Sequence, residues 1–105
     1  MIRHHVLTLT GSAQALSSVT GALNNKIRTI SLQPAGGNAN PVYVGDKITT
    51  VTSGSYGMRL EAAVATVPPA PMVLGEFAPG WCELSEFYVL GTNTEVLHIL
   101  VDYYN

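Results

Sequence analysis

Charged residues are scarce in this sequence of 105 residues. Lys and Arg contribute five and Asp and Glu seven, which is 11% of the chain, less than half of the roughly 25% typical of soluble domains. The net charge is −2 at pH 7. The few basic residues are scattered, whereas binding to nucleic-acid phosphates needs clustered Lys and Arg. We therefore expect no nucleic-acid partner.

Cysteine and long apolar runs are also nearly absent. The single cysteine, Cys82, cannot form an internal disulfide, which fits folding in a reducing cytoplasm. No run approaches the roughly 18 apolar residues of a membrane-spanning helix, and the first ten residues lack the pattern of a secretory signal. We expect a soluble protein that is made in the cytoplasm and has no membrane partner.

Helical patterns are missing as well. Apolar residues rarely recur at the spacing of a helix face, whereas Gly, Pro, Asn and Ser recur between short runs rich in Val, Ile, Thr and Tyr. This alternation predicts an all-β protein. We expect residues 1–105 to form a single β-sandwich domain of about seven or eight short antiparallel strands, of jelly-roll or Greek-key type.

The expected strands lie between turn-forming residues. They cover residues 2–10, 26–33, 42–44, 58–67, 72–77, 84–90 and 94–104. Residues 13–18 are ambiguous, and residues 47–52 are either an edge strand or a structured loop. Residues 1–25 are either an arm that precedes the core or its first strand.

Two features of the expected strands concern pairing. Gly91-Thr92-Asn93 predicts a tight turn that joins the last two strands as a hairpin. The last strand is apolar on both faces, which indicates a central strand or one held between subunits. The Gly-rich residues 35–40 lack the Lys-Ser/Thr ending and the following helix of a phosphate-binding loop, so we expect a flexible loop there.

Histidines are the first candidates for a metal site. His4 and His5 are neighbours, and neighbouring side chains on a strand point to opposite faces, so the pair cannot chelate one ion. His98 has only Asp102 at a plausible ligand spacing. We expect no metal site and no cofactor.

Catalytic residues are equally hard to assemble. A nucleophilic cysteine needs a base and a lowered pKa, and nothing near Cys82 in the sequence supplies either. Glu83 and Glu86 are close in sequence, but a solvated turn does not separate two carboxyl pKa values for acid–base work. The sequence therefore predicts a protein that is not an enzyme.

Aromatic residues supply the candidate contact positions, because Tyr and Trp are enriched in interface cores. The candidates fall in turns or near strand ends. They are Tyr56, Trp81, Tyr103 and Tyr104. The alternative is that most aromatic side chains belong to the core or to its edge.

Most of the chain resembles a pattern found in small structural proteins of tailed bacteriophages. The similar segments are residues 27–33, the Gly/Asn loop after them, Pro41-Val42-Tyr43-Val44-Gly45-Asp46, Gly57-Met58-Arg59-Leu60, residues 83–91 and residues 96–104. Together they lie within residues 26–104. The resemblance implies a capsid cement or decoration protein, a β-sandwich that oligomerises on the outside of a shell.

The functional expectation follows from the scarce charge and this resemblance. We expect a non-enzymatic virion protein on the head surface, which binds the major capsid protein of the same virion, stabilises the head, and associates with itself as a dimer or trimer. The alternative is a carbohydrate- or receptor-binding module of a phage fibre or tail. In that case Trp81 and a tyrosine would stack on a sugar beside Asn38, Asn40 or Asn93.

Overall fold

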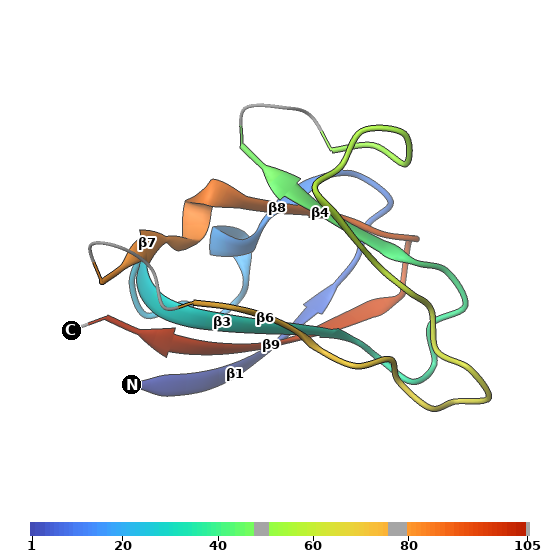
Figure 1. The fold of residues 1–105 in the computed structure, drawn as a ribbon, viewed down its shortest axis with the longest axis horizontal. Helices are drawn as coiled ribbons and strands as arrows, with labels where there is room; N and C mark the ends of the chain where they lie inside the picture. Colours follow the sequence, from blue (N-terminus) through green and yellow to red (C-terminus); the bar gives the residue numbers. More distant parts are fainter. Residues whose placement is uncertain (48–50, 76–79, 105) are drawn as a thin grey trace.

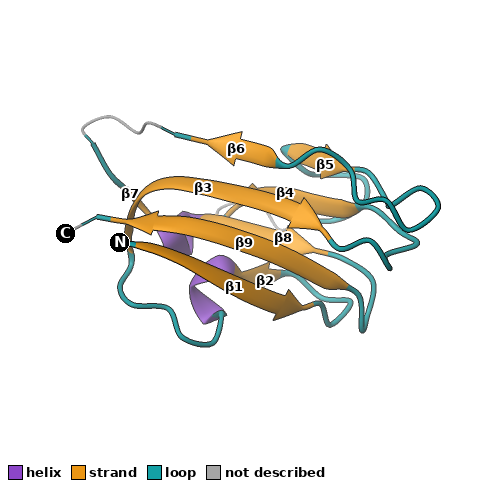
Figure 2. Cartoon of the chain, turned by 90° about the horizontal axis from the view of Figure 1, so that it is seen from below, coloured by secondary structure: helices purple, strands orange, loops and turns teal. Residues whose placement is uncertain are grey.

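A computed structural model describes residues 1–47, 51–75 and 80–104 of the chain. Their strands form two antiparallel sheets that face each other, as Figures 1 and 2 show. Short 3-10 turns, η1 (Leu16–Ser18) and η2 (Leu84–Glu86), are the helical segments of these residues. The prediction of an all-β sandwich is confirmed.

Sheet A contains the longest described strands together with two short ones, and sheet B contains strands of two to five residues. Sheet A has the order β1 (Ile2–Thr8), β9 (Val96–Tyr103), β3 (Lys26–Pro34) and β6 (Met72–Leu74), with β7 (Cys82–Glu83) also on β3. Sheet B has the order β2 (Gln14–Ala15), β8 (Phe87–Leu90), β4 (Val42–Asp46) and β5 (Met58–Leu60). Leaving aside β7, each early strand pairs with a later one in nested fashion: β1 with β9, β2 with β8, β3 with β6, and β4 with β5.

One apolar core lies between the sheets and uses alternate residues along the strands, except at the bulge between Ile27 and Thr29 of β3. On β9 the side chains of Leu97, Ile99 and Val101 are buried, while Leu100 on the opposite face is exposed. The full set of buried side chains in this core is Leu7, Leu9, Leu16, Val19, Ile27, Ile30, Leu32, Val42, Val44, Leu60, Leu84, Val89, Leu97, Ile99, Val101 and Tyr103. Strand β9 lies between β1 and β3, which confirms its predicted central position.

The first 25 residues are part of the sandwich. Strand β1 pairs with β9 along its whole length of seven residues, and Leu9, Leu16 and Val19 enter the core. In this structure, residues 2–8 of this segment therefore form the first strand of sheet A.

The predicted hairpin between the last two strands is wrong. Strand β8 belongs to sheet B and β9 to sheet A, so residues 91–95 cross from one sheet to the other. Leu9 holds this crossing: its N–H donates to the Glu95 carbonyl at 2.8 Å, and its carbonyl accepts from Thr94 N–H at 2.9 Å. A Cβ on Gly91 would lie 2.3 Å from Leu9 Cδ1. A glycine is therefore needed at position 91 because the Leu9 side chain packs against its backbone, and not because the chain makes a tight hairpin turn there.

The long strand predicted over residues 58–67 is also wrong. Strand β5 ends at Leu60, and the chain later reverses between Val64 and Val67, whose backbones exchange two hydrogen bonds. Ala65 and Thr66 form this reversal with positive φ angles of 49° and 65°, a conformation that alternating side chains do not reveal.

Two other predicted strands are shorter than expected. Residues 84–86 form the η2 turn before β8, and β6 covers only Met72–Leu74 of the strand predicted over 72–77. Residues 76–77 of that strand, and residues 48–50 of the ambiguous segment 47–52, lie outside the described residues.

The Gly-rich loop after β3 is fastened to β9. The Asn38 side chain donates from Nδ2 to the Val96 carbonyl at 2.7 Å, and its Oδ1 accepts from Val96 N–H at 3.0 Å. The Glu95 carboxylate accepts from the backbone N–H groups of Ala39 and Asn40. Asn38 is 5% exposed. Its buried side-chain amide bonds with the N–H and carbonyl of Val96, as the backbone of a neighbouring strand would. This loop, expected to be flexible, is therefore anchored at several backbone groups.

Tyr103 lies in the core and not on a contact surface, because its side chain is 1% exposed. Its hydroxyl forms a hydrogen bond of 2.8 Å with His5 Nε2, and the two rings meet edge to face. His5 is itself 7% exposed. The alternation of β9 that buries Leu97, Ile99 and Val101 also turns Tyr103 inward, which corrects its prediction as an interface residue.

Removing the Asn38 amide should destabilise the fold. In Asn38→Ala, the Val96 N–H loses its partner and the Val96 carbonyl keeps only the Ala35 N–H, at a part-buried position. We expect this to cost about 1–3 kcal/mol of unfolding free energy. Urea unfolding followed by circular dichroism measures the change. Asn40→Ala is the control, because Asn40 contacts Glu95 through its backbone nitrogen. Equal stability of the two variants would contradict the anchoring role.

Alkaline pH should weaken the fold through Tyr103. Burial raises the pKa of its phenol, so the unfolded chain releases this proton at a lower pH than the folded chain. The stabilising contribution is therefore lost as pH rises above about 10. Tyr103→Phe should be less stable at neutral pH, since His5 loses a partner, and should lose stability less steeply between about pH 9 and 11. Unfolding of the exposed variant Tyr56→Phe should retain the wild-type slope, and an unchanged slope in Tyr103→Phe would refute the assignment.

Candidate interaction surfaces

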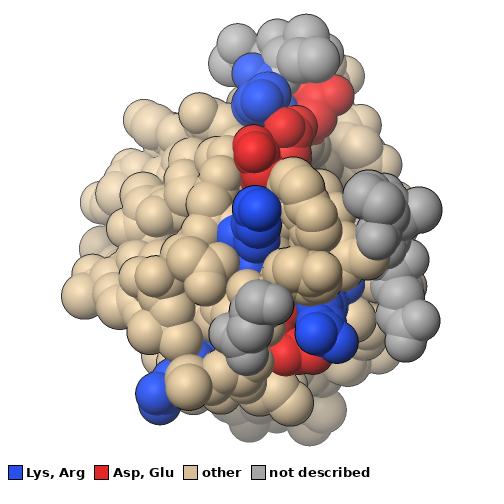
Figure 3. All heavy atoms as spheres, turned by 90° about the vertical axis from the view of Figure 1, so that its left-hand side faces the viewer, with Lys and Arg blue, Asp and Glu red and all other residues tan. Residues whose placement is uncertain are grey.

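Charged side chains gather at one end of the sandwich, where Figure 3 shows Lys and Arg beside Asp and Glu in a band across the surface. Strand register places Lys26 opposite Glu83. Lys47 Nζ lies 2.9 Å from Glu86 Oε1, and the Arg28 guanidinium lies 5.1 Å from the centre of the Tyr104 ring. Several of these charges therefore lie near an opposite charge or an aromatic ring.

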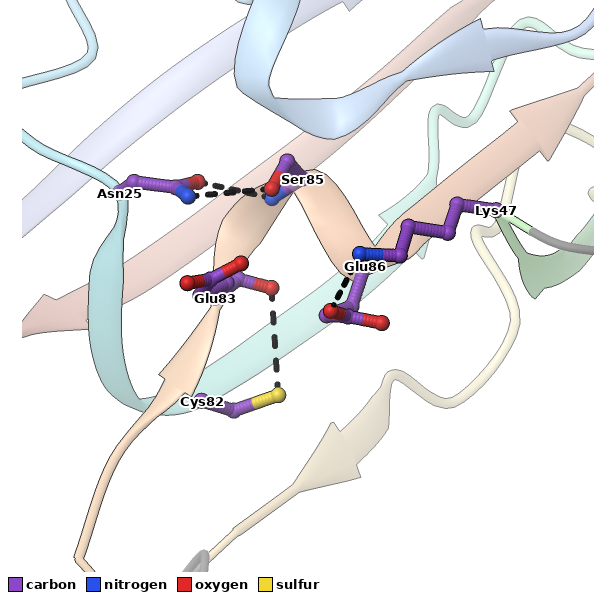
Figure 4. Close-up of polar contacts among 6 residues, drawn as sticks. All are labelled: Asn25, Lys47, Cys82, Glu83, Ser85 and Glu86. Atoms are coloured by element: carbon purple, nitrogen blue, oxygen red, sulfur yellow. Dashed lines mark hydrogen bonds and ion pairs between the residues drawn. The ribbon is translucent and has the colours of Figure 1, made fainter.

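Figure 4 shows how polar contacts order the segment that follows β7. Asn25 and Ser85 exchange two hydrogen bonds, of 3.0 and 2.9 Å. The hydrogen bond with Glu86, together with the charge of that carboxylate, raises the pKa of Lys47. The Glu86 carboxylate is thus held by a lysine on a neighbouring element.

Cys82 is not prepared as a nucleophile. Burial raises the pKa of its thiol, which is opposite to the shift that generates a reactive thiolate. Its Sγ lies 3.8 Å from the Glu83 carbonyl oxygen (Figure 4). The residue is half-buried and packs against the core, so its environment is that of a structural side chain.

An open apolar cleft of about 660 Å³ lies between the two sheets at this end. Trp81 lies on it, and Lys26 Nζ sits 4.5 Å from the centre of the indole ring. The lining residues are Val44, Gly45, Asp46, Gly57, Met58, Met72, Leu74, Trp81, Cys82, Glu83, Glu86 and Phe87. Its wall of Met, Leu, Trp and Phe side chains suits contact with an apolar group.

The outer face of sheet A differs from the charged end. Its rows cross the strands in register, and one row runs His4, Leu100, Ser31 and Val73 over β1, β9, β3 and β6. The positions of this face are Ile2, His4, Val6, Thr8, Thr29, Ser31, Gln33, Val73, Val96, His98, Leu100 and Asp102. Among them Asp102 alone carries a formal charge. Ile2, Val6, Val73 and Leu100 are large apolar residues with 49–66% of their surface exposed.

Two histidines meet on the outer face of sheet A. His4 Nε2 and His98 Nδ1 lie 3.2 Å apart, with ring centres 5.4 Å apart. His5 points into the core, which confirms that the neighbouring His4 and His5 face opposite sides. Sequence reasoning missed the pair because His4 and His98 are 94 residues apart. Alternation along each strand predicts that His4 and His98 point outward. It does not predict that β1 pairs with β9, which brings the two side chains together.

The outer side of sheet B carries a second aromatic group. The rings of Tyr43 and Tyr56 lie 4.8 Å apart, and Tyr43 borders a shallow hollow of about 410 Å³ together with Asn40 and Asn93. Asn38 is not in this hollow, because its amide is buried against Val96.

The candidate contact residues do not form one patch. A Cβ on Gly80, the residue before Trp81, would lie 4.0 Å from the Tyr104 ring, so Trp81 and Tyr104 belong to the charged end of the sandwich. Tyr56 lies on the outer side of sheet B, and Tyr103 is in the core. Sequence reasoning selected aromatic positions, but it did not identify the uncharged outer face of sheet A.

Comparison with known proteins adds no relative. No family model matches the chain, and no curated protein and no solved structure matches it either. Within residues 1–47, 51–75 and 80–104, no helix is long and apolar enough to cross a membrane.

Proposed function

We propose that the protein is a non-enzymatic virion component that decorates the head of a tailed phage. In this proposal it is made in the host cytoplasm, binds the major capsid protein on the head surface and stabilises the shell. The observation that carries the proposal is the outer face of sheet A, where exposed apolar side chains occur with almost no charge. Charge depletion at the centre of a contact surface is characteristic of protein–protein interfaces.

The nested strand pairing supports the same proposal. Pairing each strand of the first half with its counterpart in the second half, across two sheets, is the arrangement from which we infer a jelly roll. Jelly rolls occur in viral capsid and lectin domains. Because one architecture hosts many functions, this support is weaker than that of the surface.

Repetition would make modest contacts sufficient. A shell offers many identical sites. Once one subunit of a dimer or trimer has bound, the other subunits are held near further sites at a high effective concentration, which strengthens the binding of the whole oligomer. Two-fold and three-fold positions of a shell match such oligomers. Trp81 and Tyr104 at the charged end, and Tyr56 on sheet B, remain candidates for contacts between copies or with the shell.

Binding to heads tests the proposal directly. Purified protein should co-sediment with heads assembled from the major capsid protein of the same virus and should raise their melting temperature. A lysine on the outer face should weaken binding about tenfold or more, since a charge left unpaired in an interface is costly. We expect this for Val73→Lys and Leu100→Lys.

Val64→Lys is the matched control for the head-binding experiment. Val64 is 77% exposed and lies at the chain reversal after β5, outside the strands of sheet A, so binding should be unchanged. Absence of any head binding would refute the proposed function. Binding that tolerates both face variants would refute the role of this face alone.

A carbohydrate-binding role is the second candidate, and the hollow beside Tyr43 favours it. An aromatic ring next to the side chains of Asn40 and Asn93 offers a stacking surface and amide hydrogen-bonding groups, a combination that suits a sugar. The site differs from the one expected, because Trp81 lies on the inter-sheet cleft and not on this hollow.

A glycan array distinguishes this second role. Specific binding that Tyr43→Ala abolishes, and that Tyr104→Ala at the charged end leaves intact, would support a receptor-binding module. An array without binders, alongside clear head binding, would eliminate it. Loss of binding in both variants would instead point to a general loss of structure, which circular dichroism of each variant reveals.

A further inference from the structure

We propose that His4 and His98 form a two-histidine site for a divalent transition-metal ion such as zinc or nickel. The inference is independent of head binding, because it concerns the chemistry of one pair of side chains on β1 and β9. It rests on two observations: the ring nitrogens of His4 and His98 are close together, and both side chains lie on the outer face of sheet A, outside the core.

The spacing of the two nitrogens suits a shared ion. His4 Nε2 and His98 Nδ1 are 3.2 Å apart. Two imidazole nitrogens at about 2.0–2.1 Å from a tetrahedral zinc ion lie about 3.3–3.4 Å from each other. The observed contact is a hydrogen bond, so one of these two nitrogens carries a proton. When an ion binds, that proton moves to the other nitrogen of the same ring, and both rings turn to direct their lone pairs at the ion.

The backbone holds this spacing firmly. His4 pairs with Leu100, and His98 pairs with Val6, so the histidines are diagonal neighbours on one face of adjacent antiparallel strands. Strand β9 is also fixed by β3 on its other side. A chelate assembled on two paired strands loses little conformational freedom when the ion binds, which is the advantage of a preorganised site.

The surroundings favour a nitrogen-preferring ion over calcium or magnesium. Ser31, Gln33, Pro71 and Leu100 border the two histidines in a shallow hollow of about 310 Å³, and none of these side chains is a carboxylate. Imidazole suits zinc, copper and nickel, whereas calcium and magnesium need carboxylate and other oxygen ligands. Within the described residues no third His, Cys, Asp or Glu joins the pair, so water would complete the coordination.

His5 does not compete for the ion. Its Nε2 is bonded to the Tyr103 hydroxyl in the core, and its side chain is 7% exposed. The protein thus contains two histidines that can reach an ion from solvent together and a third that serves as an internal reference.

Calorimetric titration of the untagged chain with Zn²⁺ and with Ni²⁺ tests the site. We expect about one ion per chain, and no heat of binding for Mg²⁺. His4→Gln and His98→Gln should each lower the affinity about tenfold or more, because each leaves a single imidazole in place of a chelate. Thr8→Gln places the same new side chain on the same strand and face and should leave the affinity unchanged.

Imidazole nitrogen NMR of the wild-type chain provides a test that needs no variant. Addition of Zn²⁺ should shift the signals of His4 Nε2 and His98 Nδ1 together and leave those of His5 in place. The site would be overturned if the wild-type chain binds neither ion. It would also be overturned if both glutamine variants bind the ion with the affinity of the wild-type chain. A shift of one histidine without the other would overturn the chelate.

Discussion

The fold depends on the pairing of β9 with β1 on one side and β3 on the other. These contacts join the last strand to the first over seven residues and to the long strand that opens the middle of the chain. They also hold Leu97, Ile99 and Val101 against sheet B. Because β9 pairs with both β1 and β3, contacts between residues far apart in the sequence carry the core, and sheet A is complete only when residues 96–103 are in place.

The same pairing creates the surfaces on which function is proposed. Alternation on β9 sends Tyr103 inward to His5, and sends His98 and Leu100 outward. Charges are concentrated at the end of the sandwich near β7, so the broad outer face of sheet A stays nearly neutral. A sheet face with so little charge is suited to contact with another protein surface.

Local patterns in the sequence were sufficient for the fold class and for the strands with strict alternation. Residues 94–104 match β9 closely because one side of that strand is continuously apolar. Residues 26–33 match β3 in extent, although a bulge between Ile27 and Thr29 interrupts its alternation. The hairpin prediction failed because a Gly-Thr-Asn turn is compatible with a change of sheet, and only the contact of Gly91 with Leu9 decides between the two. Residues 58–67 failed because Ala65 and Thr66 adopt positive φ angles that their residue types do not signal.

The candidate sites were harder to predict because they depend on pairing between distant segments. A pair such as His4 and His98 exists only in the observed register of β1 with β9, and a shift of one residue would send one of them into the core. The choice of Tyr103 failed for the related reason that its face is set by the register of the whole strand. Choosing among aromatic residues by type did not identify the neutral face, which consists mostly of Val, Thr, Ser and Leu.

The Asn38 amide that fastens the loop to β9 is also a group that deamidation would remove. Asn38 both donates to and accepts from the backbone of Val96, and hydrolysis of an asparagine amide to a carboxylate removes the donor half of that exchange. The resulting anion would face the Val96 carbonyl oxygen, with Glu95 next to it in the chain. Burial of Asn38 within the folded protein shields this amide. The lifetime of the loop anchor is therefore linked to how rarely this corner of the sandwich opens to water.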